Sequence, residues 1–342
     1  MTQAEPEAAE SVVVESFHYD PIQADAEPIQ SIPGVEEFFE DYLELDYEPA
    51  RVALGKQLFH DTRLSNDNTL SCSSCHDLRY AGIDRSATAT GVRGQVGPIN
   101  TPTVFNSAFN FSQFWDGRAS DLEAQADGPP NAGGEMDSNW EEITTKLSQD
   151  KVVMDMLSAA WPDEDFSEGI DSRFWLEAIA DFERTLITPA APFDQYLQGD
   201  PSAISEEAKQ GYQLFKDVGC TECHNGMAVG GKSFQRLGRK RPYFNSHTGG
   251  VDLGRFNITG DEEDRHNFKV PALRNVALTG PWFHDGTQES LSEAVRSMGE
   301  FQLDLDLSDG QVQRIVAFLV SLTGEYEGRS LRDVQNTAAS NQ

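Results

Sequence analysis

Two short segments of this chain have the residue types and spacing for redox chemistry. They read CSSCH at Cys72–His76 and CTECH at Cys220–His224. In a Cys-x-x-Cys-His segment the two thiols bond the vinyl groups of a c-type haem and the histidine ligates its iron. A zinc ribbon also uses paired cysteines, but it needs no histidine after each pair and its pairs usually lie far closer together. Because both segments carry the histidine and together use all 4 cysteines, we predict two covalent haems c and no disulfide, with the attachment residues Cys72, Cys75, His76, Cys220, Cys223 and His224.

The sixth iron ligand decides whether such a haem only passes electrons or also binds a small oxidant. None of the 7 histidines lies between the two motifs, so the segment after the first motif offers no second imidazole. Met136, Met154 and Met156 lie there and could ligate, although the last two follow a helical apolar pattern typical of a core. We therefore expect the first iron to be open or water-bound.

Met298 is the candidate sixth ligand of the second iron. It follows a predicted helix well downstream of His224, as the thioether ligand does in ordinary cytochromes c, and a core methionine is the alternative interpretation. A Met/His ligand pair raises the reduction potential. This haem would therefore suit the acceptance of electrons from a donor.

The elements that must position these motifs repeat along the chain. The segments GKQLF at Gly55–Phe59 and GYQLF at Gly211–Phe215 precede the two motifs and predict a helix in each case. A second amphipathic helix is predicted in each unit, one ended by Pro189 and one capped by Ser308. Their apolar positions are Phe174, Ile179, Phe182 and Leu186, and Val312, Ile315, Val316, Leu319 and Leu322.

These patterns predict a mainly α fold of two tandem cytochrome c-like helical domains with long ordered loops, each domain holding one covalent c-type haem. We divide the chain into an acidic arm (1–48), an N-terminal haem domain (49–190), a C-terminal haem domain (191–326) and a C-terminal tail (327–342). The join is expected within 188–201, which is rich in Pro and small residues. The arm has many Asp and Glu and no Lys or Arg, so we expect either a loosely ordered arm that wraps a folded body or a disordered tail, with ordered structure beginning near Pro49.

The formal net charge of −31 argues against nucleic-acid or anionic-membrane partners. The acidity could steer a basic donor protein or adapt the whole surface to salty surroundings, and the spread of carboxylates along the chain favours adaptation. Neither an export signal nor a membrane-spanning apolar run is expected. Because bacteria attach haem c outside the cytoplasm, we expect a periplasmic protein whose signal was removed.

Six further runs together resemble the bacterial dihaem cytochrome c peroxidases over roughly residues 48–324. A related enzyme that matures a tryptophan-derived quinone on a partner protein belongs to the same superfamily. The runs are NTPTVFN at 100–106, FWDGRA at 114–119, GEM at 134–136, TPAAPFD at 188–194, LRNVALT at 273–279, and AVRSMG at 294–299.

The resemblance implies that the first haem is peroxidatic and the second transfers electrons. It assigns the distal acid–base carboxylate to Glu135, the distal glutamine to Gln125 and the aromatic bridge between the haems to Trp115. Without it, Glu135 would read as a surface carboxylate, and Trp115 as a core residue beside a turn. It further implies hydrogen peroxide as substrate, a small periplasmic cytochrome c or cupredoxin as donor, a homodimer, and an inter-domain calcium ion. The calcium ligands would be Asn100 and the backbone carbonyls of Thr279 and Pro281.

One position departs from the family pattern. Many members have an iron-capping histidine sixteen residues after the first haem-binding histidine, whereas Val92 stands there in this chain. Valine cannot ligate iron, so the hypothesis is an enzyme that needs no reductive activation. Arg93 could enter the pocket or face solvent. Two alternatives stay open: peroxide-driven oxidation of a protein partner's side chain, and a dihaem electron carrier without catalysis.

Overall fold

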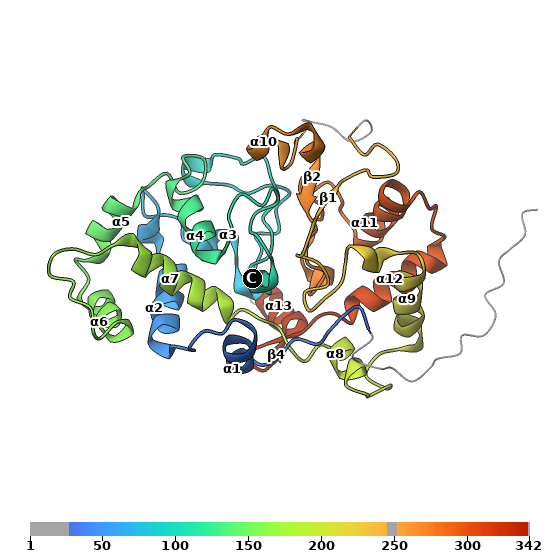
Figure 1. Cartoon of the computed structure of the whole chain (residues 1–342), viewed down its shortest axis with the longest axis horizontal. Helices are drawn as coiled ribbons and strands as arrows, with labels where there is room; N and C mark the ends of the chain where they lie inside the picture. The colour runs from blue at the N-terminus through green and yellow to red at the C-terminus, as the bar shows by residue number, and fades with distance from the viewer. Residues whose placement is uncertain (1–26, 245–251, 341–342) are drawn as a thin grey trace, which may run out of the picture.

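Two helical units lie side by side along the long axis of the molecule (Figure 1). The computed structural model describes residues 27–244 and 252–340. The predicted mainly α, two-unit fold is confirmed. The helices are α1 (Val35–Glu37), α2 (Pro49–Phe59), α3 (Cys72–Cys75), α4 (Leu122–Asn131), α5 (Trp140–Leu147), α6 (Lys151–Ala160), α7 (Ser172–Arg184), α8 (Pro192–Leu197), α9 (Glu206–Asp217), α10 (Phe256–Thr259), α11 (Leu291–Ser297), α12 (Asp309–Val320) and α13 (Leu331–Ser340).

Strands contribute little among the described residues. An antiparallel pair, β1 (Phe234–Arg236) with β2 (Asn267–Lys269), lies in the middle of the molecule in Figure 1. A second pair joins β3 (Glu325–Tyr326) to β4 (Arg329–Ser330). The architecture therefore depends on helix packing and on long loops.

Each unit is built on one pair of closely packed helices, α2 with α7 and α9 with α12. A glycine lies at each contact. A Cβ atom at Gly55 would lie 1.8 Å from the carbonyl oxygen of Ala178, and one at Gly211 would lie 1.8 Å from that of Arg314. No residue with a side chain fits such an approach. The repeated glycines thus bring the two helices of each unit into backbone contact and set the same register in both units.

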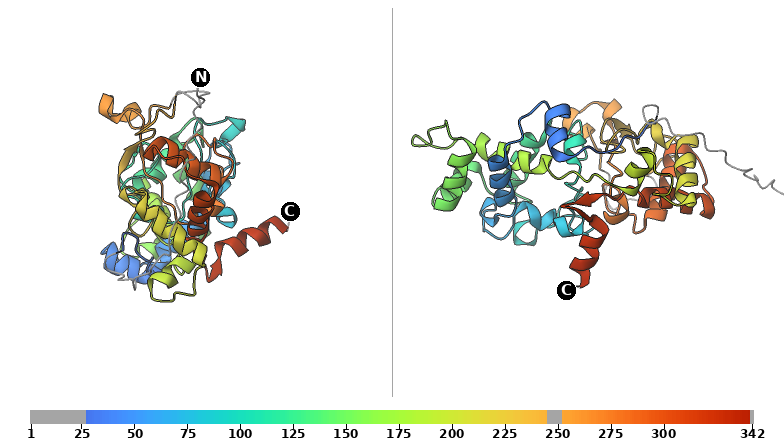
Figure 2. Two further views of the ribbon diagram at one scale, coloured as in Figure 1. Left: turned by 90° about the vertical axis from the view of Figure 1, so that its right-hand side faces the viewer. Right: turned by 90° about the horizontal axis from the view of Figure 1, so that it is seen from below.

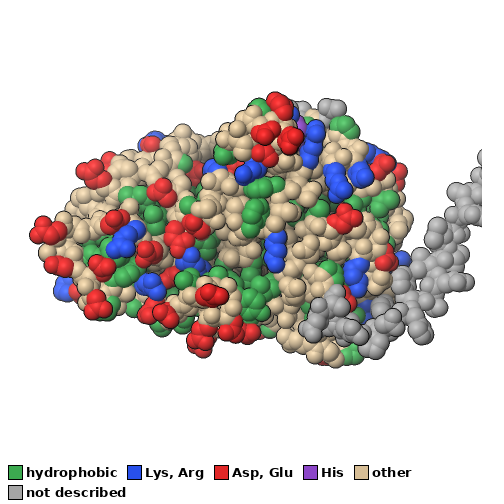
Figure 3. All heavy atoms as spheres, in the orientation of Figure 1, with side chains coloured by type: hydrophobic (Ala, Val, Ile, Leu, Met, Phe, Trp, Pro, Cys, Tyr) green, Lys and Arg blue, Asp and Glu red, His purple; other side chains and the backbone are tan. Residues whose placement is uncertain are grey.

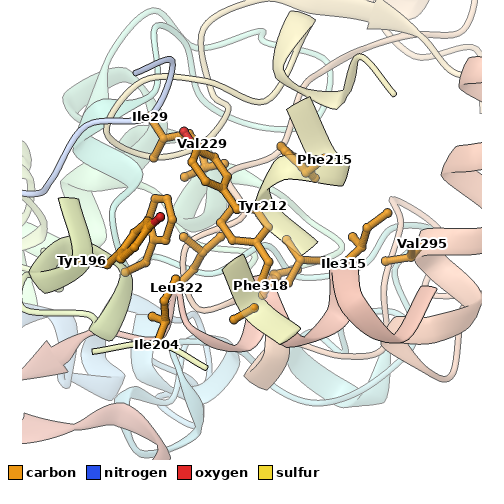
Figure 4. Close-up of a cluster of buried hydrophobic side chains, with 14 of the residues drawn as sticks. Ile29, Tyr196, Ile204, Tyr212, Phe215, Val229, Val295, Ile315, Phe318 and Leu322 are labelled. Carbon is orange, nitrogen blue, oxygen red and sulfur yellow. The ribbon is translucent and has the colours of Figure 1, made fainter. Parts of the chain in front are cut away.

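In the second unit, apolar positions of the predicted amphipathic helix after Ser308 face the core. Val312, Ile315 and Leu319 of α12 are buried in one cluster with Phe215 of α9. Figure 4 labels Ile315 and Phe215 within this cluster. The predicted cap is present, because the side chain of Ser308 accepts a hydrogen bond from the backbone N–H of Gln311 at 3.4 Å. In the first unit, Phe174 and Ile179 of α7 are buried in the same way.

The predicted join, residues 188–201, contains α8. The first residue of the join, Thr188, is buried between the two units. Thr188 is fully buried and its hydroxyl accepts hydrogen bonds from the side-chain amides of Asn106 (2.8 Å) and Asn275 (3.0 Å). Both asparagines have a left-handed backbone, with φ of 63° and 62°. Their side-chain oxygens accept from the N–H of Thr188 and of Gly324, both at 3.0 Å. One threonine therefore links matching corners of the two units.

The expectation that ordered structure begins near Pro49 is wrong for residues 27–48. Ile29 packs into the core of the second unit, while Phe38 and Phe39 pack beside Phe109 and Ala228. These apolar side chains are fully buried or nearly so, which outweighs the acidic composition of the segment. The part of the predicted arm before residue 27 lies outside the described residues.

The C-terminal segment returns to the first unit. Leu331, at the start of α13, is fully buried with Phe59, Phe182 and Leu186. The rest of α13 projects from the body of the molecule (Figure 2). Both ends of the described chain thus cross from their own unit to the other.

Acidic side chains lie over both halves of the face drawn in Figure 3. Lys and Arg side chains are scattered among them. Across residues 27–244 and 252–340, none of the helices has the length and apolar character needed to cross a bilayer.

Candidate haem-binding sites

Each Cys-x-x-Cys-His segment lines its own cavity. The first cavity, of about 320 Å³, is lined by Cys72, Cys75 and His76 together with residues of α4, α7 and the loop 89–104. The second, of about 240 Å³, is lined by Cys220, Cys223 and His224 together with residues of α11 and α12. A zinc ribbon would bring the two cysteine pairs together, so the structure contradicts that alternative.

Both motif histidines are held in the same orientation. Nδ1 of His76 lies 3.3 Å from the carbonyl oxygen of Gly82, and Nδ1 of His224 lies 3.3 Å from that of Val229. A carbonyl oxygen can only accept, so Nδ1 carries the hydrogen and Nε2 keeps its lone pair for a metal. Burial lowers the pKa of His76, and it lowers the pKa of His224 to about 4. Both imidazoles are therefore neutral, as ligation requires.

The remaining walls suit a haem. Burial raises the pKa of Cys75 to about 11 and that of Cys220 to about 12, so these thiols are uncharged at neutral pH. None of the four cysteines is in a disulfide, and apolar side chains such as Ile179 and Ile315 line the cavities beside them. Two thiols, one neutral imidazole and an apolar cavity in each unit are the groups that a covalent haem c needs.

The cavities differ most clearly along α4 and α11. Both helices begin after a polar cap, Asp121 or Ser290, and both contribute a leucine to the cavity as their first residue. Counted from that first leucine, Pro129 and Met298 occupy the same position, and each lines the cavity of its own unit. Met298 thus lies in the cavity of His224, whereas a side chain that cannot ligate occupies the equivalent position in the cavity of His76.

Glu135 and Gln125 lie together in the first cavity. Glu135 is accessible from the cavity but closely surrounded by protein atoms, and this desolvation raises the pKa of its carboxyl group. The positive charge of Arg118, which lines the same cavity, acts in the opposite direction. The backbone of Glu135 is fixed, because its carbonyl oxygen accepts a hydrogen bond from the N–H of Val92 at 2.8 Å.

Val92 itself is fully buried and is not among the residues that line the cavity. Of the two roles considered for Arg93, the structure favours the outward one, because its side chain is exposed and paired with Asp137. Met154 and Met156 pack at the core of the first unit, outside the cavity wall. Met136 is buried in that core and also reaches the wall.

Trp115 lines both cavities. Its indole N–H donates to the carbonyl oxygen of Asn100 at 3.0 Å, and its ring meets that of His284 edge-on at a centroid distance of 6.3 Å. Backbone hydrogen bonds also join the two units here: the N–H of Asn100 donates to the carbonyl oxygen of His284 at 2.7 Å, and the N–H of Lys269, at the end of β2, donates to that of Trp115 at 2.8 Å. Trp115 is therefore held at the wall between the two cavities.

The three predicted calcium ligands belong to the residues around the second cavity. Asn100, Thr279 and Pro281 all line it. The side-chain amide of Asn100 donates hydrogen bonds to the carbonyl oxygens of Ser86 and Ala87, at 2.9 and 3.2 Å. No cluster of three or more His, Cys, Asp or Glu side chains suited to a metal ion occurs within the described ranges. A calcium site here would depend on amide and backbone oxygens.

Sequence reasoning missed four residues that line the cavities: Arg118, Glu183, Lys269 and His284. His284 was detectable, because WFHDG at Trp282–Gly286 matches QFWDG at Gln113–Gly117 around a glycine with positive φ in both units. Lys269 is buried, and burial lowers its pKa to about 8. Composition carried no signal for Lys269 or Glu183, because charged residues are usually exposed.

Comparisons with known proteins agree with this arrangement. The model of the di-haem cytochrome c peroxidase family matches residues 49–202. The chain is 46% identical over 301 residues to cytochrome c peroxidase Ccp of Escherichia coli, covering 88% of this chain and 62% of that protein. It is 43% identical to cytochrome c551 peroxidase of Nitrosomonas europaea, covering 89% of this chain and 86% of that protein.

The fold is also similar to the crystal structure of a MauG-like protein associated with microbial copper homeostasis. The TM-score is 0.74 at 26% identity, covering 91% of this chain and 96% of that one. The chain spans less than two thirds of the E. coli relative but most of the other two proteins.

Proposed function

Because this chain belongs to the di-haem cytochrome c peroxidase family, we propose that it reduces hydrogen peroxide to water with electrons from a small donor protein. The overall reaction consumes one H₂O₂, two protons and two electrons and yields two H₂O. The observation that carries the proposal is the difference between paired positions of the two cavities, with Met298 in one and Pro129 in the other.

When bound, the haem at His76 would supply a site for peroxide and the haem at His224 would supply electrons. Glu135 would accept the proton of the nearer peroxide oxygen and return it to the farther one. Its raised pKa supports this role, since a carboxyl group poised closer to neutral pH both takes and gives a proton readily. Gln125 would orient the peroxide by a hydrogen bond.

Electrons would pass from the second unit to the first across Trp115. Its contact with both cavities and its fixed indole N–H support this assignment. Met298 would ligate the second iron and raise its potential, which suits a haem that accepts electrons. The donor would be a small cytochrome c or a cupredoxin.

The first iron would stay accessible without prior reduction. Val92 replaces the histidine that caps the iron in many members, and the equivalent of the methionine ligand is a proline. Met136, which is buried in the core cluster and also reaches the cavity wall, is the remaining thioether that could approach the iron. The paired positions thus support a first haem with His76 as its one protein ligand.

Several further assignments belong to the same proposal. Calcium would bind Asn100 and the carbonyl oxygens of Thr279 and Pro281, which all line the second cavity. The protein would act in the periplasm, where haem c is attached, and would form a homodimer like many family members.

Oxidation of a protein partner's side chain is the second candidate function. Val92 and the 26% identity to a MauG-like protein favour it. Met298 argues against it, because the quinone-maturing relatives have a tyrosine ligand at the second haem. Turnover assays that offer a donor cytochrome or candidate protein substrates would separate the two functions.

The decisive experiment is optical and paramagnetic spectroscopy of the fully oxidised holoprotein, with and without calcium, followed by peroxide addition. We expect one high-spin haem and one low-spin Met/His haem, and peroxide turnover without pre-reduction. Two low-spin haems and no turnover would instead indicate an electron carrier.

A further inference from the structure

Glu183 is a buried carboxyl group that the proposed mechanism leaves unused. It lies on α7 with 5% of its surface exposed and lines the first cavity one turn after Ile179. Across the described ranges its carboxyl group has no hydrogen bond and no salt bridge. A buried carboxylate without a partner is costly, so its presence calls for a reason.

The second unit shows that the fold does not need a carboxyl group here. Gly55 contacts Ala178 and Phe182 as Gly211 contacts Arg314 and Phe318, so the two helix pairs share one register. That register matches Glu183 with Leu319, a buried residue that lines the second cavity. Position and burial are therefore the same in both units, and only the first unit places an ionisable group there.

The charges around Glu183 do not neutralise it. Arg184, the next residue on α7, is already paired with Glu123 of α4 at 2.6 Å and with Asp181 at 2.8 Å. The charge of Arg184 attracts an ionised Glu183 and lowers its pKa, whereas the charge of Glu123 repels it and raises the pKa. Burial is the main cause of the raised pKa of Cys72 on α3, and the charge of Glu183 adds to it. The other charged or titratable groups of the cavity wall are His76, Cys75, Arg118 and Glu135. Burial outweighs these influences and raises the pKa of Glu183 to about 8.

We propose that Glu183 binds one proton when the haem of the first unit is reduced and releases it when that haem is oxidised. Reduction adds one negative charge beside a group in a poorly solvated cavity. A carboxylate there would be repelled, and protonation removes the repulsion. One electron from the second unit and one proton from solvent thus enter together, and the net charge of the cavity does not change.

The direction of the effect follows from linkage. Oxidised iron carries the more positive charge and lowers the pKa of Glu183, and reduction raises it. At any pH between the pKa of Glu183 with oxidised iron and its pKa with reduced iron, each electron is accompanied by a proton. The reduction potential of the first haem therefore falls as the pH rises through this interval. The inference rests on haem attachment at His76, which the proposed function also assumes, but it does not rest on peroxide turnover.

The test is a potentiometric titration of both haems in the holoprotein between about pH 6 and 9, the range around the raised pKa. In the wild type we expect the reduction potential of the first haem to fall by up to about 59 mV per pH unit. This corresponds to a tenfold change in the equilibrium constant of a one-electron reduction. Glu183→Gln keeps the shape of the side chain, and Glu183→Leu copies the second unit. Both should remove that slope and leave the second-haem profile unchanged. Glu135→Gln, in the same cavity, should retain it.

A slope that persists in both Glu183 variants, or is absent from the wild type, would overturn the proposal. If the variants fail to fold, redox-difference infrared spectra of wild-type protein with isotope-labelled glutamate give the same answer. A protonated carboxyl band must then grow on reduction, and its absence would also reject the proposal. Peroxide turnover is measured in parallel: loss of turnover with an intact slope would count against the proposed function alone.

Discussion

The two cavities share their supporting residues and differ at the positions that carry chemistry. Phe182 and Phe318, and likewise Asn106 and Asn275, make equivalent contacts. The differing pairs are Pro129 with Met298, Gln125 with Ala294, Glu183 with Leu319, Asn100 with Lys269, and Trp115 with His284. A duplicated scaffold thus supports two different haem environments, because a few side chains in the walls can change while the helix contacts stay the same.

The charges of the two cavities also differ. The first has the carboxyl groups of Glu135 and Glu183 together with the guanidinium of Arg118, whereas the second has the buried amine of Lys269 and no carboxyl group among its lining residues. A positive charge near a haem favours the reduced form and a negative charge favours the oxidised form. The positive charge of Lys269 would therefore favour electron transfer from a donor to the second haem. The carboxyl groups would favour proton uptake at the first haem.

The largest expected effect comes from making the first cavity as unreactive as the second. Glu135→Gln removes the acid–base group, so peroxide turnover should fall by about 10²- to 10⁴-fold. The spectrum of the second haem should not change. Glu141→Gln, an exposed glutamate on α5, is the control and should retain full turnover.

The pH profile sharpens this test. A raised carboxyl pKa means that the ionised base is present above that pKa and is lost as the pH falls through it. Wild-type turnover should therefore decline on the acid side at a pH above the ordinary value for glutamate, 4.5. Glu135→Gln should lack this acid limb. An unchanged limb would assign the base to another residue.

The next effect tests the shared join. Thr188→Val keeps the shape of the side chain but leaves the buried amides of Asn106 and Asn275 without their acceptor. Unsatisfied buried donors cost roughly 1–3 kcal/mol each, so for the two amides we expect the free energy of unfolding to fall by about 2–6 kcal/mol. Chemical denaturation measures it. Thr188→Ser retains the hydroxyl and should recover most of the loss.

Removing the thioether should make the second cavity resemble the first. In Met298→Leu we expect the potential of the second haem to fall by on the order of 0.1 V, a fraction of the range of about 0.8 V that axial ligands span. Redox titration measures the change, and a new high-spin signal should accompany it. Met227→Leu alters a methionine outside the cavity wall and should change neither.

The smallest effect concerns Lys269. Lys269→Met removes a positive charge worth roughly 1 kcal/mol, so the potential of the second haem should fall by about 40 mV near pH 7. Because the pKa of Lys269 is lowered to about 8, the wild-type lysine loses its charge as the pH rises through that value. The difference between wild type and variant should therefore vanish at higher pH. Lys240→Met, at an exposed position, should show no such difference.

The local elements were predictable because short-range patterns determine them. The repeated segments at Gly55 and Gly211 and the cap at Ser308 follow from helical periodicity and capping chemistry. The arm was mispredicted from its acidity, because composition does not show that Ile29 and Phe39 find pockets in distant parts of the chain. Glu183 was missed for the same reason, since its sequence neighbours read as an ordinary amphipathic helix.

The sequence by itself determined the two haem motifs, the paired helices that carry them and the candidate Met298, because each depends on covalent spacing or on contacts within a few turns. Only the tertiary structure decided which residues share a cavity. The equivalent positions in the two cavities depend on the register between segments far apart in the chain. Pro129 is equivalent to Met298 and Glu183 to Leu319, while Trp115 lies at the wall that both cavities share. That register is set by backbone contacts at two glycines and by hydrogen bonds to one buried threonine, which no local pattern specifies.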